Sequence, residues 1–394
     1  MRLSSIIIGT IAAAVIGCGG QVAASTNESA DYPVVTHLWS EYPSWSVFGV
    51  AGNRAVAPDE GITFVGNGKS ITIEAGERYV LVNPKTGGSM GVLEDLYEID
   101  YNFSQKDYDP CMQLYGNGNA DSVCLTNIDI LPSSLSRPSV MILATSTSDS
   151  ADAFIVEESL VGENLLATLD NIRKAGIEVR GLDKSVSDFT LFRAIEEAGG
   201  NWEDYADLWS YADPAVAATG MQQRDDKFQA IVVWNPFKME TLARRGDSVR
   251  VVVDSGIIPN EIIDSVFMSQ ALLDQPHGER AAQGIIHSFY AVCDRMNAST
   301  TRDDTLIAIG ERFSNLSLGA MRQVVRETVF YDTPAKSFGL MTDPNFPATM
   351  DRVTQFSLDR DATDQRATVS FGNERGSNLR IDASFIEAYQ QSQP

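Results

Sequence analysis

The sequence contains few histidines and cysteines, and this scarcity excludes several kinds of catalytic site. Its 394 residues include 3 histidines and 4 cysteines, with neither a Cys-x-x-Cys pair nor a His-Glu-x-x-His motif. Structural zinc sites and zinc peptidases depend on such spacings. His277 and His287 fall in a predicted helical region, where surface or packing roles are expected. We therefore expect no metal, no cofactor and no catalytic residues.

Basic residues are also scarce relative to acidic ones. The chain has 30 lysines and arginines against 53 aspartates and glutamates, which gives a formal net charge of -23. Nucleic-acid binding needs clustered basic residues, so we exclude a nucleic-acid partner. The charge favours neutral or cationic ligands through long-range attraction, although solubility alone also explains an acidic surface. The many acids leave a glycosidase-type carboxylate pair open, without a motif that points to one.

Long apolar runs are missing after the first residues. The run from 6 to 17 is too short to span a bilayer and has the position of the apolar part of a signal peptide. It leads into Val15-Ile16-Gly17-Cys18, which is similar to a bacterial lipobox with Cys18 as the lipidated residue. Cleavage after Ala24 is the alternative. Either way we expect export to the periplasm or cell envelope, with residues 1–24 as the signal and the start of a tether.

The cysteines that follow Cys18 do not form a complete disulfide framework, because their number is odd. Cys124 lies in the apolar run Val123-Cys124-Leu125, which favours a buried free thiol. A bridge between Cys111 and Cys124 stays open, since an exported protein meets an oxidising compartment. The sequence does not decide the state of Cys293.

The stretch from 229 to 269 has the pattern of an α/β unit. Apolar runs at 230–233 and 249–253 predict two strands, and Asn235-Pro236 predicts the start of a helix with Asn235 as its N-cap. In open parallel sheets, ligands bind outside the carboxyl ends of the strands. The residues at these ends are Trp234, Asn235, Asp254 and Ser255.

Similar units elsewhere, followed by a mostly helical C-terminal part, predict two α/β lobes around a shared cleft. The chain would cross between the lobes near residues 146–152 and 254–259. We assign residues 25–148 and 256–394 to lobe 1, and residues 149–255 to lobe 2. Short strand-like runs and glycine-rich turns at about 54–88 predict a β-rich insertion in lobe 1, for which the sequence suggests no function.

Several short motifs occur in a defined order between residues 34 and 384. They are Trp39-Ser40-x-Tyr42-x-x-Trp45, Thr126-Asn127-Ile128-Asp129, Ser185-Val186-Ser187, Trp234-Asn235-Pro236, Asp254-Ser255-x-Ile257-Ile258-Pro259-x-Glu261-Ile262-Ile263-Asp264, Phe330-Tyr331-Asp332 and Leu379-Arg380-Ile381-Asp382-Ala383-Ser384. In this order they resemble the periplasmic substrate-binding proteins of bacterial ABC importers for nitrate, sulfonates and taurine. Within that family they are most similar to the branch associated with urea carboxylase, for which urea or guanidine-type ligands are proposed.

This resemblance implies a two-lobed periplasmic-binding-protein type II fold with two chain crossings and a helical C-terminal part. It implies a monomeric binder, not an enzyme, that delivers a small nitrogen-rich neutral or cationic solute, of the guanidine or urea type, to an ABC permease and its ATPase. Nitrate or a sulfonate is the alternative ligand, because the wider family binds anions. A ligand-sensing lipoprotein is an alternative role. Enzymes of the thiamine-pyrimidine synthase type share the fold, but their histidine- and cysteine-rich apparatus is not visible here.

Strand ends and family motifs together nominate ten residues for ligand contact. They are Trp39, Tyr42, Trp45, Asn127, Asp129, Asp152, Ser187, Trp234, Asn235 and Ser255. Aromatic faces attract flat cations, and a carboxylate such as Asp129 can pair with a guanidinium through two parallel hydrogen bonds. Simpler roles stay open: core packing for Trp39, helix capping for Asp129 and Ser187, and a hinge contact for Ser255. The segment that contains Asp152 departs from the family pattern, so its ligand contacts are open as well.

Overall fold

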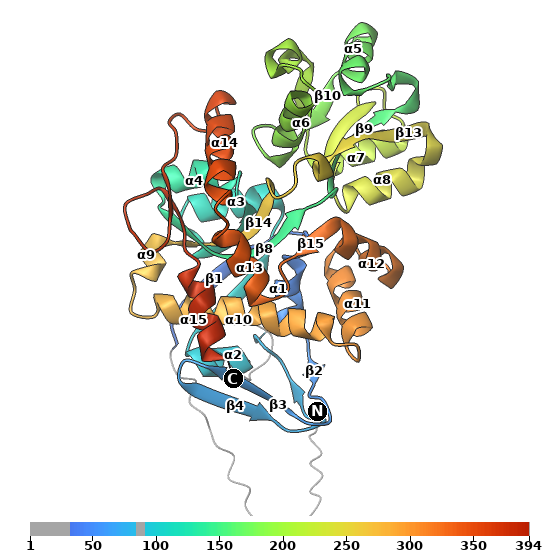
Figure 1. Cartoon of the computed structure of the whole chain (residues 1–394). Helices are drawn as coiled ribbons and strands as arrows, with labels where there is room; N and C mark the ends of the chain where they lie inside the picture. The colour runs from blue at the N-terminus through green and yellow to red at the C-terminus, as the bar shows by residue number, and fades with distance from the viewer. Residues whose placement is uncertain (1–31, 84–90, 394) are drawn as a thin grey trace, which may run out of the picture. The chain divides into compact units, whose positions relative to one another are not determined.

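Two β-sheets with flanking helices organise the part of the chain that the computed structural model describes, residues 32–83 and 91–393 (Figure 1). The expected α/β class is confirmed. From Pro33 onward the chain forms one compact unit. The predicted signal peptide, the tether and the lipidated Cys18 lie outside the described residues. None of the helices in the described ranges has the length and apolar character needed to cross a membrane.

The larger sheet has eight strands, in the order β16-β17-β8-β14-β7-β1-β6, with β15 paired to β8. Strands β1, β6 and β7 are parallel, whereas β14 is antiparallel to both β7 and β8. Every residue of β8 is buried, which explains its unbroken apolar run at 140–144. The strands are β1 (Val34–Trp39), β6 (Asp100–Gln105), β7 (Ser122–Thr126), β8 (Ser139–Ser148), β14 (Ile263–Ser269), β15 (Thr328–Phe330), β16 (Val369–Phe371) and β17 (Leu379–Ile381).

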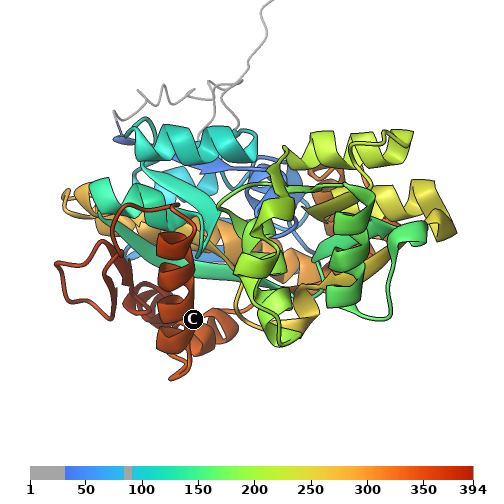
Figure 2. The same ribbon diagram turned by 90° about the horizontal axis from the view of Figure 1, so that it is seen from above.

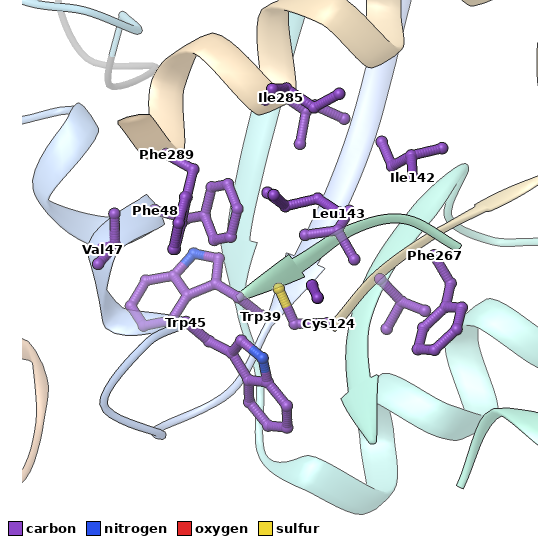
Figure 3. Packing of buried hydrophobic residues seen from close by; sticks show 14 of the residues in the cluster. Trp39, Trp45, Val47, Phe48, Cys124, Ile142, Leu143, Phe267, Ile285 and Phe289 are labelled. Atoms are coloured by element: carbon purple, nitrogen blue, oxygen red, sulfur yellow. The ribbon is translucent and has the colours of Figure 1, made fainter. Parts of the chain in front are cut away.

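Helices before residue 140 and after residue 269 pack with this sheet around the main hydrophobic core. Figure 3 shows part of that core, where Phe289 of α10 lies beside Phe48 of α1, with their ring centres 5.9 Å apart. The helices are α1 (Ser46–Ala51), α2 (Val92–Tyr97), α3 (Tyr108–Gly116), α4 (Ile130–Ser136), α9 (Gln270–Leu273), α10 (Gly278–Asn297), α11 (Arg302–Arg312), α12 (Leu318–Glu327), α13 (Pro334–Met341), α14 (Phe346–Asp359) and α15 (Ser384–Ser392).

The smaller sheet has five strands, in the order β11-β10-β12-β9-β13. They are β9 (Asp152–Glu157), β10 (Val179–Gly181), β11 (Trp209–Tyr211), β12 (Ala230–Trp234) and β13 (Val249–Asp254), and the helices in the same stretch are α5 (Leu165–Ala175), α6 (Val186–Glu197), α7 (Pro214–Gln223) and α8 (Phe237–Arg245). We propose that the two sheets are the cores of the two lobes, with the lobe boundaries that the sequence suggests.

Three details differ from the sequence predictions. Strands β12 and β13 flank α8 as expected, but β9 lies between them and is antiparallel to both, so the sheet is mixed. Helix α8 begins at Phe237, and Pro236, not Asn235, holds the N-cap position. The backbone N–H of Asn235 instead donates to the Ala151 carbonyl. Strand β14, a central strand of the larger sheet, is not recognisable from the sequence pattern, because its buried faces interrupt apolar residues with Asp264 and serines.

The cysteines at 111, 124 and 293 are buried free thiols. The open alternative of a bridge between Cys111 and Cys124 is therefore not realised in the structure. Burial raises the pKa of Cys111 to about 12. A thiol of this kind is unreactive, because the thiolate is the nucleophile and the metal ligand.

The segment between 54 and 83 contains two small antiparallel pairs. Strand β3 (Ile62–Gly66) forms a hairpin with β4 (Lys69–Ile73), and β2 (Ala55–Val56) pairs with β5 (Arg78–Tyr79). The hairpin turns through Asn67 and Gly68, both with positive φ, as a two-residue turn of this kind requires. This segment lies away from the functional site described below.

Helix α14 joins the C-terminal part of the chain to α6 of the smaller sheet, and both views of the ribbon show the two helices close together (Figures 1 and 2). The buried Phe356 of α14 contacts Phe189 and Phe192 of α6. Around these rings lies a set of ion pairs that we call the ion-pair cluster, formed by Arg360 with Asp188, and by Arg193 and Arg352 with Glu261.

Candidate functional site

A cavity of about 430 Å³ lies where the carboxyl ends of parallel strands from both sheets meet. Its lining follows β1, β6 and β7 of the larger sheet and β10, β11 and β12 of the smaller one. This is the location at which open α/β sheets bind ligands. The lining residues are Ser40, Glu41, Tyr42, Trp45, Asp107, Tyr108, Asp109, Pro110, Thr126, Asp152, Leu182, Val186, Asp213, Pro214, Ala215, Trp234, Phe237, Ile262 and Asp264.

Four aromatic rings form a continuous wall of this cavity. Tyr42 and Trp45 lie 4.8 Å apart, Trp45 stacks on Tyr108 at 5.7 Å and 7°, and Tyr108 meets the edge of Trp234 at 5.8 Å. These separations are typical of favourable aromatic pairs, so the rings hold one another in place. The Tyr42 hydroxyl and the Trp45 indole N–H are buried and have no hydrogen-bond partner of acceptable geometry among the described residues. Both polar atoms are therefore available to a ligand.

Two buried carboxylates occupy the inner end of the cavity. Asp152 begins β9 directly after one chain crossing, and Asp264 lies in β14 after the return crossing. Ser148 donates a hydrogen bond to Asp152, and Ser146 donates to Asp264 at 2.6 Å. Side chains two residues apart on a strand share one face and are about 7 Å apart. Ser146 and Ser148 are two residues apart on β8, so the two carboxyl groups that they contact are neighbours.

Burial changes the protonation of this inner pair. It raises the pKa of Asp152 to about 7, against the opposing effect of the Ser148 hydrogen bond. Burial also raises the pKa of Asp264, and the charge of Asp152 adds to that effect. The pKa of Tyr42 is raised by burial and then by both carboxylates, so its phenol stays neutral. Two such carboxyl groups resist ionising together unless a cation joins them.

A second pair of acids lies at the outer part of the cavity. Asp109 is in the first turn of α3, whereas Asp213 is the N-cap residue of α7, in the smaller sheet's half of the structure. Both side chains are half-buried. Burial raises the pKa of Asp109, and the facing charge of Asp213 raises it further. One oxygen of Asp213 accepts the N–H groups of Ala215 and Val216, which leaves its second oxygen available.

No lysine or arginine appears among the residues that line the cavity, within the part of the chain that the structure describes. Lys238 of α8 is a base whose charge lowers the pKa of Asp152. Its ammonium group donates to the Ser150 carbonyl and pairs with Glu327 at 3.2 Å. The protein's own cations therefore leave the cavity acids without direct partners.

Of the ten residues nominated from the sequence, four line the cavity together. They are Tyr42, Trp45, Asp152 and Trp234. They come from three segments that are far apart in the chain: Tyr42 and Trp45 precede α1, Asp152 begins β9, and Trp234 ends β12 as the sequence pattern suggests.

Three other nominated residues pack behind the cavity lining. Trp39 lies over Gly49 of α1, where an added Cβ would approach its ring to 2.6 Å, so it is a packing residue. Asn127 is buried and bridges the backbone of Glu261 and Ile263 through its amide. Asp129 accepts hydrogen bonds from Tyr108 at 2.6 Å and from Thr126 at 2.7 Å. It thereby positions a cavity ring without lining the cavity.

Of the remaining three nominated residues, Ser255 contacts the backbone beside a chain crossing, whereas the Asn235 amide bonds to a side chain and Ser187 lies in α6. Ser255 shares a hydrogen bond of 2.8 Å with Ser148 and accepts the N–H of Asp152 at 3.3 Å. The amide of Asn235 donates to Glu327 at 3.0 Å. Ser187 is buried in the first turn of α6, and its hydroxyl has no partner among the described residues. None of these three side chains lines the cavity.

Sequence reasoning missed three important cavity residues, Asp264, Tyr108 and Asp109. Asp264 stood inside a quoted family motif, but its strand was not recognised. Tyr108 and Asp109 follow strand β6 within a few residues. The rule that ligands gather at carboxyl strand ends, applied to β6, would have indicated both of them.

Comparison with known proteins shows the fold. No family model matches the chain, and no curated protein matches it. The periplasmic aliphatic sulphonate-binding protein SsuA from Escherichia coli matches with 14% identity and a TM-score of 0.59 over 84% of this chain and 89% of that one. The alkanesulfonate-binding protein SsuA from Xanthomonas axonopodis pv. citri, bound to MOPS, matches with 11% identity and a TM-score of 0.55 over 82% and 95%.

The periplasmic nitrate-binding protein NrtA from Synechocystis PCC 6803 is also similar, with 11% identity and a TM-score of 0.51 over 92% of this chain and 98% of that one. These matches each cover more than four fifths of both chains. The chain therefore has the periplasmic-binding-protein fold.

Proposed function

We propose that this protein is the extracytoplasmic solute-binding component of an ABC importer, and that it captures a small nitrogen-rich cation or neutral amide, with guanidine or urea as the preferred types. The fold supports the first part, because the similar structures named above are titled as periplasmic binding proteins. Export to the periplasm and delivery to a permease and its ATPase belong to the same proposal. So does a lipid anchor at Cys18 on a monomeric protein.

One observation carries the ligand class: buried carboxylates and aromatic faces line the cavity without a basic residue. Contact between a cation and an aromatic face contributes about 0.5–2 kcal/mol of binding free energy. Carboxylates accept charge-assisted hydrogen bonds from N–H donors. Asp152 and Asp264 supply the acceptors, while Trp45 and Tyr108 supply the faces. An anion in the same place would meet these carboxylates with no cation to offset them.

Nitrate or a sulfonate is the second candidate ligand. The similar structures include sulfonate- and nitrate-binding proteins by their titles. The unpartnered Tyr42 hydroxyl and Trp45 N–H are donors that an anion accepts. For an anion to bind, both inner carboxyl groups must be protonated, which favours this candidate only below neutral pH.

Titration calorimetry of the purified protein at pH 8 with guanidinium, urea, nitrate and taurine tests the proposal. We expect guanidinium or urea to bind and nitrate and taurine to give no heat. Asp264→Asn should weaken guanidinium binding roughly 10- to 150-fold, because charge-assisted hydrogen bonds contribute about 1.5–3 kcal/mol. The surface variant Asp226→Asn makes the same charge change on an exposed residue outside the cavity and should bind like the unaltered protein. Binding of nitrate or taurine without guanidinium or urea would refute the proposed ligand class.

A further inference from the structure

The cavity carries acids at two separate depths. Asp152 and Asp264 are almost fully buried, with 3% and 1% of their surface exposed. Asp109 and Asp213 are half-buried and come from opposite halves of the structure, α3 and α7. We call these the inner pair and the outer pair. Each pair brings two like charges together, and within the described residues no lysine or arginine forms a salt bridge with a member of either pair.

The aromatic wall connects the two pairs. Tyr42 lies beside the inner pair, where both of its carboxylates act on the phenol. From Tyr42 the wall continues through Trp45 to Tyr108, which immediately precedes Asp109 of the outer pair. A ligand that reaches from one pair to the other therefore lies along aromatic faces. Such a surface suits an aliphatic chain better than a polar one.

The unpartnered Tyr42 hydroxyl is an independent sign that a ligand belongs at the inner end. Only 5% of Tyr42 is exposed, and its hydroxyl makes no hydrogen bond of good geometry within the described residues, although Asp264 and Ser148 lie near enough to act on its pKa. A buried hydroxyl without a partner costs free energy, and native structures seldom retain one without a reason. An ammonium group held by Asp152 and Asp264 would donate to this oxygen as well, since an ammonium carries three N–H donors.

We propose that the solute is an aliphatic dication of the α,ω-diamine class, with one ammonium group between Asp152 and Asp264 and the other between Asp109 and Asp213. This inference deepens the proposed function and rests on it. The outer pair joins the two halves of the structure through the second ammonium group. A dication would thus favour the arrangement in which α3 and α7 approach each other, because it offsets the repulsion between their acids.

A ligand series with a common four-carbon chain tests the proposal by titration calorimetry on the purified protein at pH 8. The probes are 1,4-diaminobutane, n-butylamine and 4-aminobutyrate, which share one ammonium group. At the other end the first has a second ammonium group, the second has no charged group, and the third has a carboxylate as its last carbon. We expect the diamine to bind roughly tenfold or more tightly than butylamine, and aminobutyrate to bind less tightly than either. Diamines with three to six carbons would then show which chain length fits the cavity.

Two matched variants locate the second ammonium group. Asp109→Asn and Asp213→Asn should each weaken the diamine much more than butylamine, and so reduce the advantage of the diamine. Asparagine is a good N-cap residue, so Asp213→Asn keeps the start of α7 intact. Asp226→Asn is the surface control, and thermal unfolding verifies that each variant is folded.

The outcomes separate the two proposals. Equal binding of diamine and butylamine refutes the dication but leaves a cation-binding protein. Tighter binding of aminobutyrate than of the diamine also refutes the dication and indicates a zwitterionic solute. If no amine binds while guanidinium or urea does, the dication is wrong and the proposed function stands. Binding of nitrate or taurine alone overturns both.

Discussion

The cavity and the ion-pair cluster both bury aspartate side chains, and they differ in what faces these carboxylates. In the cluster, Asp188 is fully buried and receives the guanidinium of Arg360 on both of its oxygens. Burial raises the pKa of Asp188 to about 6, and Arg360 opposes that rise. In the cavity, Asp264 is almost as buried, but the groups that act on it within the described residues are the neutral hydroxyls of Ser146 and Tyr42, not a base.

This difference separates structural acids from ligand-binding acids. Removing a carboxylate from water costs several kcal/mol, and a native partner must offset that cost where the charge serves the fold. The cluster contains such partners and ties α6 to α14. The inner pair of the cavity lacks them, so its carboxyl groups either take up protons or meet a cation from outside the protein. A search for buried acids without bases therefore finds the site more reliably than a search for acids alone.

The largest expected effect is on stability, from removal of a cluster base. Arg360→Met leaves Asp188 buried without a cationic partner, with only the backbone N–H of Lys184 donating to it, and should lower the free energy of unfolding by about 3–5 kcal/mol at pH 8. Asp264→Asn should not lower it, because this carboxyl has no cation to lose. Arg366→Met, which breaks an exposed pair with Asp351, is the control and should change stability by about 0–1 kcal/mol. Urea unfolding measures all three, and equal losses at Arg360 and Asp264 would contradict the distinction.

The next effect is the pH dependence of cation binding. The folded-state pKa of Asp152 is raised to about 7, so below pH 7 a cation must displace a proton. Affinity should therefore fall about tenfold for each pH unit below 7 for one displaced proton, and level off above it. In the absence of ligand, folding stability changes with pH in the opposite direction to ligand affinity. The unfolded chain releases the proton near pH 4 and the folded chain near pH 7, so Asp152 lowers stability as pH rises between these values.

Calorimetry of guanidinium or diamine between pH 5.5 and about 8.5 measures this dependence. Asp152→Asn should reduce the slope. A slope that persists unchanged in Asp152→Asn would assign the proton to Asp264 or to the outer pair.

The smallest effect is expected from the aromatic wall. Trp45→Leu removes one aromatic face and should weaken the binding of a cation by about 0.5–2 kcal/mol, roughly 2- to 30-fold. The affinity for urea, which is neutral, should fall less in the same variant, so urea is the internal control. Tyr42 also contacts Trp45, so thermal unfolding must show that the wall still folds. Equal losses for guanidinium and urea would mean that Trp45 contributes shape and not attraction for charge.

Much of the architecture could be predicted from the sequence because it depends on local patterns. The strands β8 and β12 are apolar runs, and α10 has helical periodicity, so each was recognisable by itself. Strand β14 was not recognisable, since its polar residues are satisfied only by partners from distant strands. The hydrogen bond between Ser146 and Asp264 is one such contact, across 118 residues of sequence.

The candidate site divides in the same way. Strand ends and motifs indicated Tyr42, Trp45 and Trp234, because aromatic residues in those loops are unusual enough to be noticed. The same signals selected Asn127, whose amide donates to the Glu261 carbonyl, and Asn235, whose amide donates to the Glu327 carboxylate. No local pattern distinguishes an amide that bonds to the protein from one that is free, because the partner lies far away in the chain.

The sequence by itself determined the α/β class, the acidic charge and the scarcity of bases that an anion site would need. These properties follow from composition and short-range periodicity, which do not depend on how the chain folds back. Only the tertiary structure decided which acids have partners. Asp188 and Asp264 look alike in the sequence, and the folded chain brings an arginine to the first and an aromatic-lined cavity to the second.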